Sequence, residues 1–134
     1  MREVVINDCY GGFSLSPLAT LKLAKLKGKD CYFFNYYNFR TYTPLTLEQA
    51  EKDVSWFAYS VPNPKDYNTE EIYLPYEEIK RDDVDLIKVI KELGKKADGR
   101  FASLKIVKIP DNINYVIEEY DGMEHIAESH RTWS

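Results

Sequence analysis

Apolar residues at the start of the chain are followed by a polar turn and then by apolar residues at helical spacing. Arg2 to Ile6 predicts a short buried strand. Ser16-Pro17 predicts the beginning of a helix, because serine is a favoured N-cap and proline is favoured at the first helical position. Gly28 predicts the end of that helix, since glycine readily adopts the conformation that closes one.

The next part of the chain mixes aromatic residues with breaks. A strand is predicted from Asp30 to Tyr37, and Thr43-Pro44 is expected to break it. Thr46-Leu47-Glu48-Gln49 has the form of a capping box and predicts a short helix that ends near Asp53. Val54 to Val61 alternates weakly between apolar and polar residues and predicts another strand.

The second half holds the most regular pattern, after a short extended piece at Glu71 to Leu74. A helix is predicted from Asp82-Asp83 to Asp98-Gly99. Its buried stripe is Val84, Ile87 and Ile90, flanked by Leu86 and Leu93.

The last predicted elements are strands. Ser103 to Ile109 predicts a strand, and Asn114 to Tyr120 is predicted to pair with it as an antiparallel hairpin. Asp121-Gly122 then turns the chain into a polar C-terminal segment. These elements predict a single α+β domain over residues 1–134, with a mixed, mostly antiparallel sheet of four to five strands packed by the helices that start at Ser16 and Asp83.

Composition narrows the classes of partner. The net charge of −4 disfavours nucleic acid, since phosphate binding depends on surplus lysine and arginine. No apolar run approaches the roughly 20 residues needed to span a bilayer, and the N-terminus does not resemble a signal peptide. We therefore expect a cytoplasmic protein with Cys9 and Cys31 as reduced, buried thiols. The 11 tyrosines suit a recognition surface and also suit strands.

The glycine pair Gly11-Gly12 is the first candidate site. Glycines between a strand end and a helix start can leave backbone amides bare near the positive end of the helix dipole, where a phosphate can bind. The alternative is a tight turn that needs positive φ. We expect the pair to border one hollow together with the C-terminal His130-Arg131. The predicted ligand-binding residues are Asp8, Cys9, Tyr10, Gly11, Gly12, Ser14, His130 and Arg131.

Aromatic residues around Arg40 form the second candidate. In a strand, side chains alternate between two faces, so one face of this segment can pack on a helix while the other meets a partner. The alternative is a strand covered on both faces. The predicted partner-binding residues are Tyr36, Tyr37, Phe39, Arg40 and Tyr42.

Cysteines and histidines supply the third candidate. Cys9 as nucleophile with His130 as base would make a small hydrolase, although any cysteine and histidine can be paired in this way. His125 and His130 are five residues apart, which places them on different faces of a helix and disfavours a shared metal. Since no catalytic set is complete, we expect no enzyme activity, no metal and no cofactor.

Both ends of the chain resemble a family of short uncharacterised proteins encoded by bacteriophages and prophages. The resemblance rests on Asn7 to Ser16, on Glu92 to Pro110, and on Glu119 to Glu124 with His130 to Trp133; the middle of the chain, Tyr36 to Lys80, is outside it. It implies a small accessory protein acting in a bacterial cytoplasm, and it carries over no catalytic residues.

Small phage accessory proteins most often act by stoichiometric binding. We therefore expect a protein that inhibits a host defence component, with self-association left open. One alternative is sequestration of a nucleotide signal at the Gly11-Gly12 corner, and a second is cysteine-dependent hydrolysis.

Overall fold

The computed structural model describes residues 1–36, 42–53, 55–62 and 79–128. It combines short helices with strands that pair antiparallel in small sheets, which confirms the predicted α+β class. The elements, in chain order, are β1 (Arg2–Asn7), α1 (Pro17–Leu26), β2 (Tyr32–Tyr36), β3 (Tyr42–Leu45), α2 (Leu47–Lys52), β4 (Phe57–Tyr59), α3 (Val84–Leu93), the 3-10 helix η2 (Gly94–Ala97), β5 (Leu104–Ile109), β6 (Tyr115–Tyr120) and β7 (Met123–Glu128).

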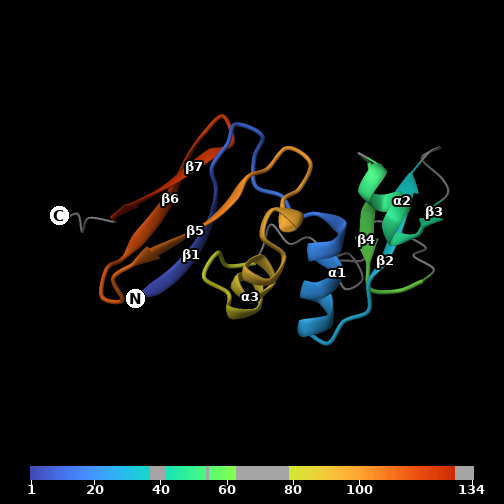
Figure 1. Ribbon diagram of the computed structural model, residues 1–134, viewed down its shortest axis with the longest axis horizontal. Coiled ribbons are helices and arrows are strands. Elements are labelled where there is room, and N and C mark those ends of the chain that lie inside the picture. Colours follow the sequence, from blue (N-terminus) through green and yellow to red (C-terminus); the bar gives the residue numbers. More distant parts are fainter. Residues whose placement is uncertain (37–41, 54, 63–78, 129–134) are drawn as a thin grey trace, which may run out of the picture.

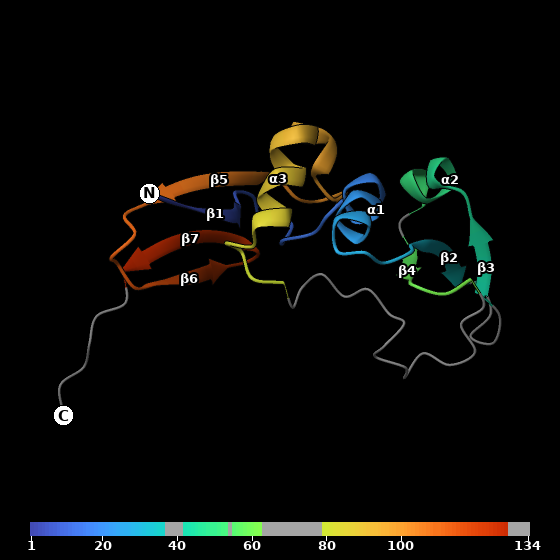
Figure 2. The same ribbon diagram turned by 90° about the horizontal axis from the view of Figure 1, so that it is seen from below.

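The described strands form three small antiparallel sheets rather than one sheet of four to five strands. β1 pairs with β5, β6 pairs with β7, and the third sheet has the order β3-β2-β4. Figures 1 and 2 show the β1–β5 and β6–β7 pairs as two layers at one end of the molecule, with the β3-β2-β4 sheet and α2 at the other end and α1 and α3 between them.

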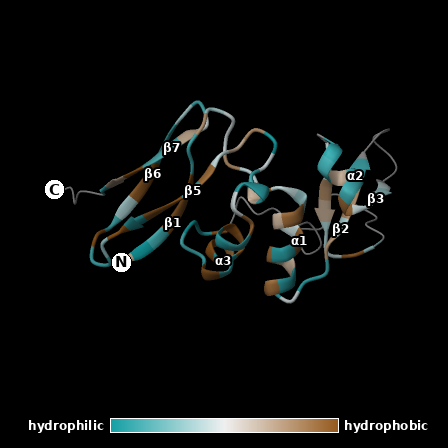
Figure 3. Cartoon of the chain, in the orientation of Figure 1, coloured by the Kyte–Doolittle hydropathy of each residue, from teal (hydrophilic) through white to brown (hydrophobic). Residues whose placement is uncertain are grey.

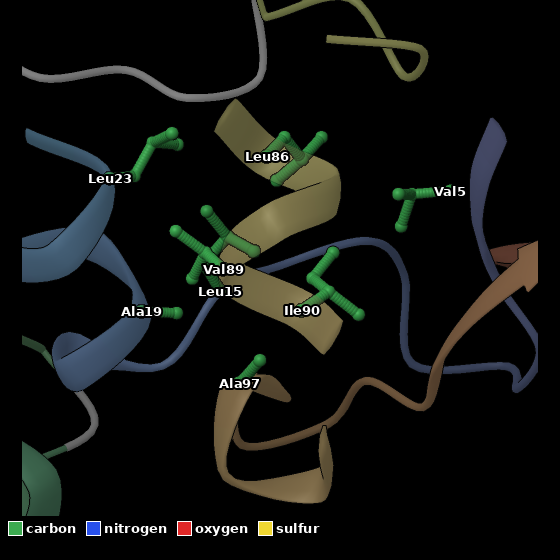
Figure 4. Close-up of a cluster of buried hydrophobic side chains, with 8 residues drawn as sticks. All are labelled: Val5, Leu15, Ala19, Leu23, Leu86, Val89, Ile90 and Ala97. Carbon is green, nitrogen blue, oxygen red and sulfur yellow. The ribbon is translucent and has the colours of Figure 1, made fainter. Parts of the chain in front are cut away.

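The main core lies where α3 packs between α1 and β1, as Figure 4 shows. Leu23 and Ala19 approach α3 from α1, and Val5 approaches it from β1. The cluster consists of Val5, Leu15, Ala19, Leu23, Leu86, Val89, Ile90 and Ala97, all buried. A second cluster of Ala24, Phe33, Ala50 and Ala58 joins α1 to the other sheet, so α1 is buried on two sides. Figure 3 shows hydrophobic and hydrophilic residues side by side along both α1 and α3.

Capping residues set the helix boundaries as the sequence predicts. The hydroxyl of Ser16 accepts the backbone N–H of Ala19 at 3.1 Å, and Gly28 follows α1 with φ +72°. Thr46 and Gln49 form both hydrogen bonds of the capping box before α2.

The predicted break at Thr43-Pro44 is wrong, because both residues lie within β3. β3 is an edge strand of its sheet, with Phe34 as the Cα partner of Pro44. An edge strand has one side free of partner strands, so the missing N–H of a proline is tolerated there.

The predicted β5–β6 hairpin is also wrong. β5 pairs instead with β1, from Arg2 opposite Ile109 to Asn7 opposite Leu104. β6 forms its hairpin with β7 through Asp121-Gly122, whose φ angles of 49° and 90° suit the tight turn that an Asp-Gly pair favours. The segment predicted as a polar tail therefore supplies a strand.

The predicted buried stripe of α3 is wrong at Val84, which is 79% exposed at the first helical position. Ile90 is buried as predicted, Leu86 and Val89 are buried beside it, and Ile87 and Leu93 are partly buried against them. The helix ends at Gly94, where φ is +58°, and continues only as η2.

The extended piece predicted at Glu71 to Leu74 lies outside the described residues. Among the described residues, no helix has the length and apolar character needed to cross a membrane.

Candidate functional site

Asn7, at the end of β1, ties three chain segments together. Its side-chain amide donates to the backbone oxygens of Cys9 and Gly122, both at 2.8 Å. Its side-chain oxygen accepts the backbone N–H of Ser103 at 2.8 Å. Asn7 is fully buried, and these bonds use both amide hydrogens and the oxygen. The loops after β1, before β5 and between β6 and β7 therefore meet at one place, which Figure 1 shows at the upper edge of the two-layer end.

Glycines allow the loops to approach this closely. A Cβ atom on Gly11 would lie 1.6 Å from the carbonyl oxygen of Phe101, and one on Gly122 would lie 2.6 Å from the carbonyl oxygen of Tyr10. Gly12 has φ +87°, which disfavours other residues. The backbone contact at Gly11 and the positive φ at Gly12 agree with the tight-turn alternative for this pair.

A buried ion pair lies next to Asn7, where the three loops meet. Glu124 of β7 accepts the backbone N–H of Asn7 at 2.8 Å and also pairs with Arg81. The guanidinium carbon of Arg81 lies 3.6 Å from the centre of the Phe13 ring, which is a favourable cation–π position. The loop after β1 is therefore fixed on both sides.

Three exposed aromatic residues lie in these joined loops or next to them. Tyr10 is 65% exposed, Phe101 is 65% exposed and Tyr120 is 71% exposed. Phe101 contacts the loop at Gly11, and Tyr120 stands two residues before Gly122, which contacts Tyr10 and Gly12. We call Tyr10, Phe101 and Tyr120 the aromatic end. Of these three residues, only Tyr10 is predicted from the sequence as part of a site. Phe101 and Tyr120 come near it only because strands that are distant in sequence pair with each other.

The N-terminus of α1 and the glycine pair contact different segments of the chain. The backbone N–H of Ser16 donates to the carbonyl of Ala97 at 2.9 Å, and the carbonyl of Ser14 accepts from Gly99 at 3.0 Å. The hydroxyl of Ser16 donates to the carbonyl of Lys96 at 2.6 Å. Residues 96–99 thus cover the helix start, and Gly11-Gly12 instead contacts Phe101 and Gly122. Anion binding by the pair stays a prediction of the sequence.

The structure brings together some of the predicted ligand-binding residues. Asp8, Cys9, Tyr10, Gly11, Gly12 and Ser14 share the loop between β1 and α1. His130 and Arg131 lie outside the described residues, so their approach to this loop stays a prediction. The hairpin that precedes them does reach it, through Gly122 and Glu124.

Most of the predicted partner-binding residues also lie outside the residues that the structure describes. Tyr37, Phe39 and Arg40 are not among the described residues. Tyr36 ends β2 and Tyr42 begins β3, and the two are Cα partners across the sheet. The surface predicted there stays a prediction.

The two cysteines are both free thiols and only half-buried. The Cys9 thiol donates to the carbonyl of Phe101, with a sulfur–oxygen distance of 3.0 Å, and so takes part in the bonding of the corner. Burial raises the pKa of the Cys31 thiol to about 12. Within the described part of the chain, no cluster of three or more potential ligands could hold a metal ion. A Cys9-dependent hydrolase stays a prediction.

Comparison with known proteins finds no match for this chain among family models, curated proteins or solved structures.

Proposed function

We propose that this protein acts by stoichiometric binding to another protein, and that the aromatic end is its contact surface. The observation that carries the proposal is the exposure of Tyr10, Phe101 and Tyr120, each about two-thirds or more, on loops that share one buried hydrogen-bond network. Exposed aromatic residues on neighbouring chain segments favour a protein interface, since large rings supply contact area at a small entropic cost.

Rigidity supports the same proposal. The Asn7 bonds and the close contact of Gly11 with Phe101 hold the loops in one arrangement before any partner arrives. A surface that is already ordered loses less conformational entropy on binding, so more of its contact energy appears as affinity.

The finer proposal concerns the target. The resemblance of both chain ends to phage proteins supports a host defence component as the partner, bound in the bacterial cytoplasm and inhibited by occupation rather than by a reaction. This proposal is an analogy at the level of the family and does not depend on the fold.

Capture from bacterial cells tests the contact surface. The tagged protein is expressed beside variants that carry Tyr10→Ala, Phe101→Ala and Tyr120→Ala, singly and together, and stoichiometrically bound proteins are identified. We expect the triple variant to lose the partner while its circular dichroism and thermal unfolding stay close to those of the parent. Tyr32→Ala and Val84→Ala remove exposed apolar groups elsewhere and serve as matched controls.

The same assay separates this surface from the one predicted from the sequence. If Tyr37→Ala or Arg40→Ala abolishes capture and the triple variant does not, the contact surface lies on the aromatic segment around Arg40. Undiminished capture by the triple variant would overturn the assignment to the aromatic end.

A further inference from the structure

Acidic residues flank the aromatic end in sequence. Asp8 lies two residues before Tyr10, Glu119 precedes Tyr120, and Asp121 follows it. All three acidic residues are exposed. Among the ion pairs and hydrogen bonds found within the described part of the chain, none uses these three carboxylates.

The basic residue nearest in sequence to the aromatic end lines a separate groove. Arg100 precedes Phe101, and it lines a groove of about 470 Å³ beside the start of α1, together with Lys95 and Lys96. Glu51, Asp53 and Asp98 line the same groove, so it carries both signs of charge, whereas the charged residues that flank Tyr10 and Tyr120 in sequence are acidic.

We infer that the aromatic end binds a segment rich in arginine and lysine on a partner protein. This inference rests on the proposed function and names the chemistry of the partner. Guanidinium groups stack on tyrosine and phenylalanine rings, and neighbouring carboxylates add charge-assisted hydrogen bonds to the same groups. Exposed rings with exposed carboxylates close by in the chain can bind a basic side chain in both ways, whereas an acidic or purely apolar partner would leave the carboxylates unmatched.

A synthetic nona-arginine peptide is the probe, and amide chemical shifts of the whole protein report where it binds. We expect shift changes centred on Tyr10, Phe101 and Tyr120. Each single change of these residues to alanine should weaken binding about two- to fivefold, the effect of losing one exposed cation–π contact. Nona-lysine should bind more weakly, because an ammonium group stacks less well than a guanidinium group.

Matched charge variants separate this inference from general attraction to an acidic protein. One variant carries Asp8→Asn, Glu119→Gln and Asp121→Asn; asparagine is tolerated at position 121, where φ is +49°. The control carries Asp30→Asn, Glu48→Gln and Glu51→Gln, three exposed acidic residues on other elements. We expect at least a fivefold loss of affinity in the first variant and less than a twofold loss in the control.

Equal losses in the two charge variants, or shift changes spread over the whole surface, would overturn the inference. The proposed function fails differently. If the alanine variants of the aromatic end lose their captured protein while the two charge variants behave alike, the contact surface stands and the basic partner is refuted. If the alanine variants keep that protein, the proposed contact surface is refuted.

Discussion

Arg81 and Glu124 form a two-pronged ion pair that joins the segment before α3 to β7, with an Nη1–Oε1 distance of 2.5 Å and an Nη2–Oε2 distance of 2.9 Å. The side chains are 18% and 7% exposed. Each charge is compensated, since Glu124 also accepts from Asn7 and Arg81 lies over the ring of Phe13. The pair therefore links the β6–β7 layer to β1 at the base of the aromatic end.

Removal of one member of this pair should be costly. We expect Glu124→Ala to lower the free energy of unfolding by about 3–5 kcal/mol, because it leaves the guanidinium of Arg81 buried without its partner. Denaturant unfolding at neutral pH measures the change. The control is Glu48→Ala, which breaks a pair with Lys52 whose side chains are 83% and 78% exposed, and which should cost no more than about 1 kcal/mol. Equal small effects would show that the Arg81–Glu124 pair does not secure the layer.

Gly11 should not tolerate even one added carbon. A Cβ there would lie 1.6 Å from the carbonyl oxygen of Phe101, so the backbone of the corner must move. We expect Gly11→Ala to cost about 2–3 kcal/mol, the effect of an overpacked site. Gly28→Ala adds the same atom in open space with φ +72° and should cost about 1–2 kcal/mol. Thermal unfolding of the two variants compares them, and a Gly11→Ala variant as stable as the parent would contradict the close packing of the corner.

Local signals predicted the helices better than the strand partners. Ser16, Thr46 and Asp83 cap their own helices through hydrogen bonds to residues two or three positions away, so the sequence alone carries that information. Strand pairing depends on which apolar faces cover each other. β1 and β5 pair across the length of the chain, and nothing in either segment distinguishes that partner from the neighbouring β6.

The site could likewise be predicted only as far as local sequence signals reach. Tyr10 stood beside the glycine pair and could be selected from the sequence, whereas Phe101 and Tyr120 become its neighbours only through the bonds of Asn7 and the β6–β7 turn. The Asp121-Gly122 pair is the signal that could have revealed this hairpin, because it is a preferred two-residue turn between strands. It would have placed Tyr120 at a strand end beside the turn.

Cys31 should be almost inert in the folded protein. Burial raises its pKa to about 12, so at about pH 8 roughly one thiol in 10⁴ is ionised, and only the thiolate attacks a disulfide reagent. In a Cys9→Ser variant we expect a chromogenic disulfide reagent to react about 50- to 100-fold more slowly than with a free cysteine of pKa about 8.5, because the greater nucleophilicity of a more basic thiolate partly offsets its lower fraction. Addition of denaturant should restore the ordinary rate. A fast reaction without denaturant would show that burial does not raise the pKa of Cys31 in this way.

The ion pairs of Lys27 should make the contact between α1 and α3 depend on pH. Lys27 Nζ lies 2.9 Å from Asp83 Oδ2 and 3.1 Å from Asp85 Oδ2. The hydrogen bond to Asp83 raises the pKa of Lys27 above its ordinary 10.5, against the opposing effect of burial. Burial tends to raise the pKa of Asp83, but the hydrogen bonds from Lys27 and from the backbone of Leu86 and Asp85 outweigh it and hold the pKa below 3.8.

The signs of these two shifts define the pH window. The contribution of Asp83 is fully present above its unfolded pKa of 3.8 and is lost as the pH falls through its lowered folded pKa. The contribution of Lys27 is fully present below its unfolded pKa of 10.5 and is lost as the pH rises through its raised folded pKa. The pair therefore stabilises the fold throughout the range between these two limits.

Lys27→Met isolates this contribution while keeping most of the side-chain length. We expect it to lower the free energy of unfolding by about 0.5–1 kcal/mol at neutral pH, since the paired groups are 25% to 36% exposed. The difference from the parent should shrink as the pH approaches either limit, whereas the exposed Lys25→Met control should show little difference at any pH. Denaturant unfolding over the pH series measures both variants. A Lys27→Met effect that stays constant below the lowered pKa of Asp83 would show that packing of the methylene stem, rather than the charge, joins the two helices.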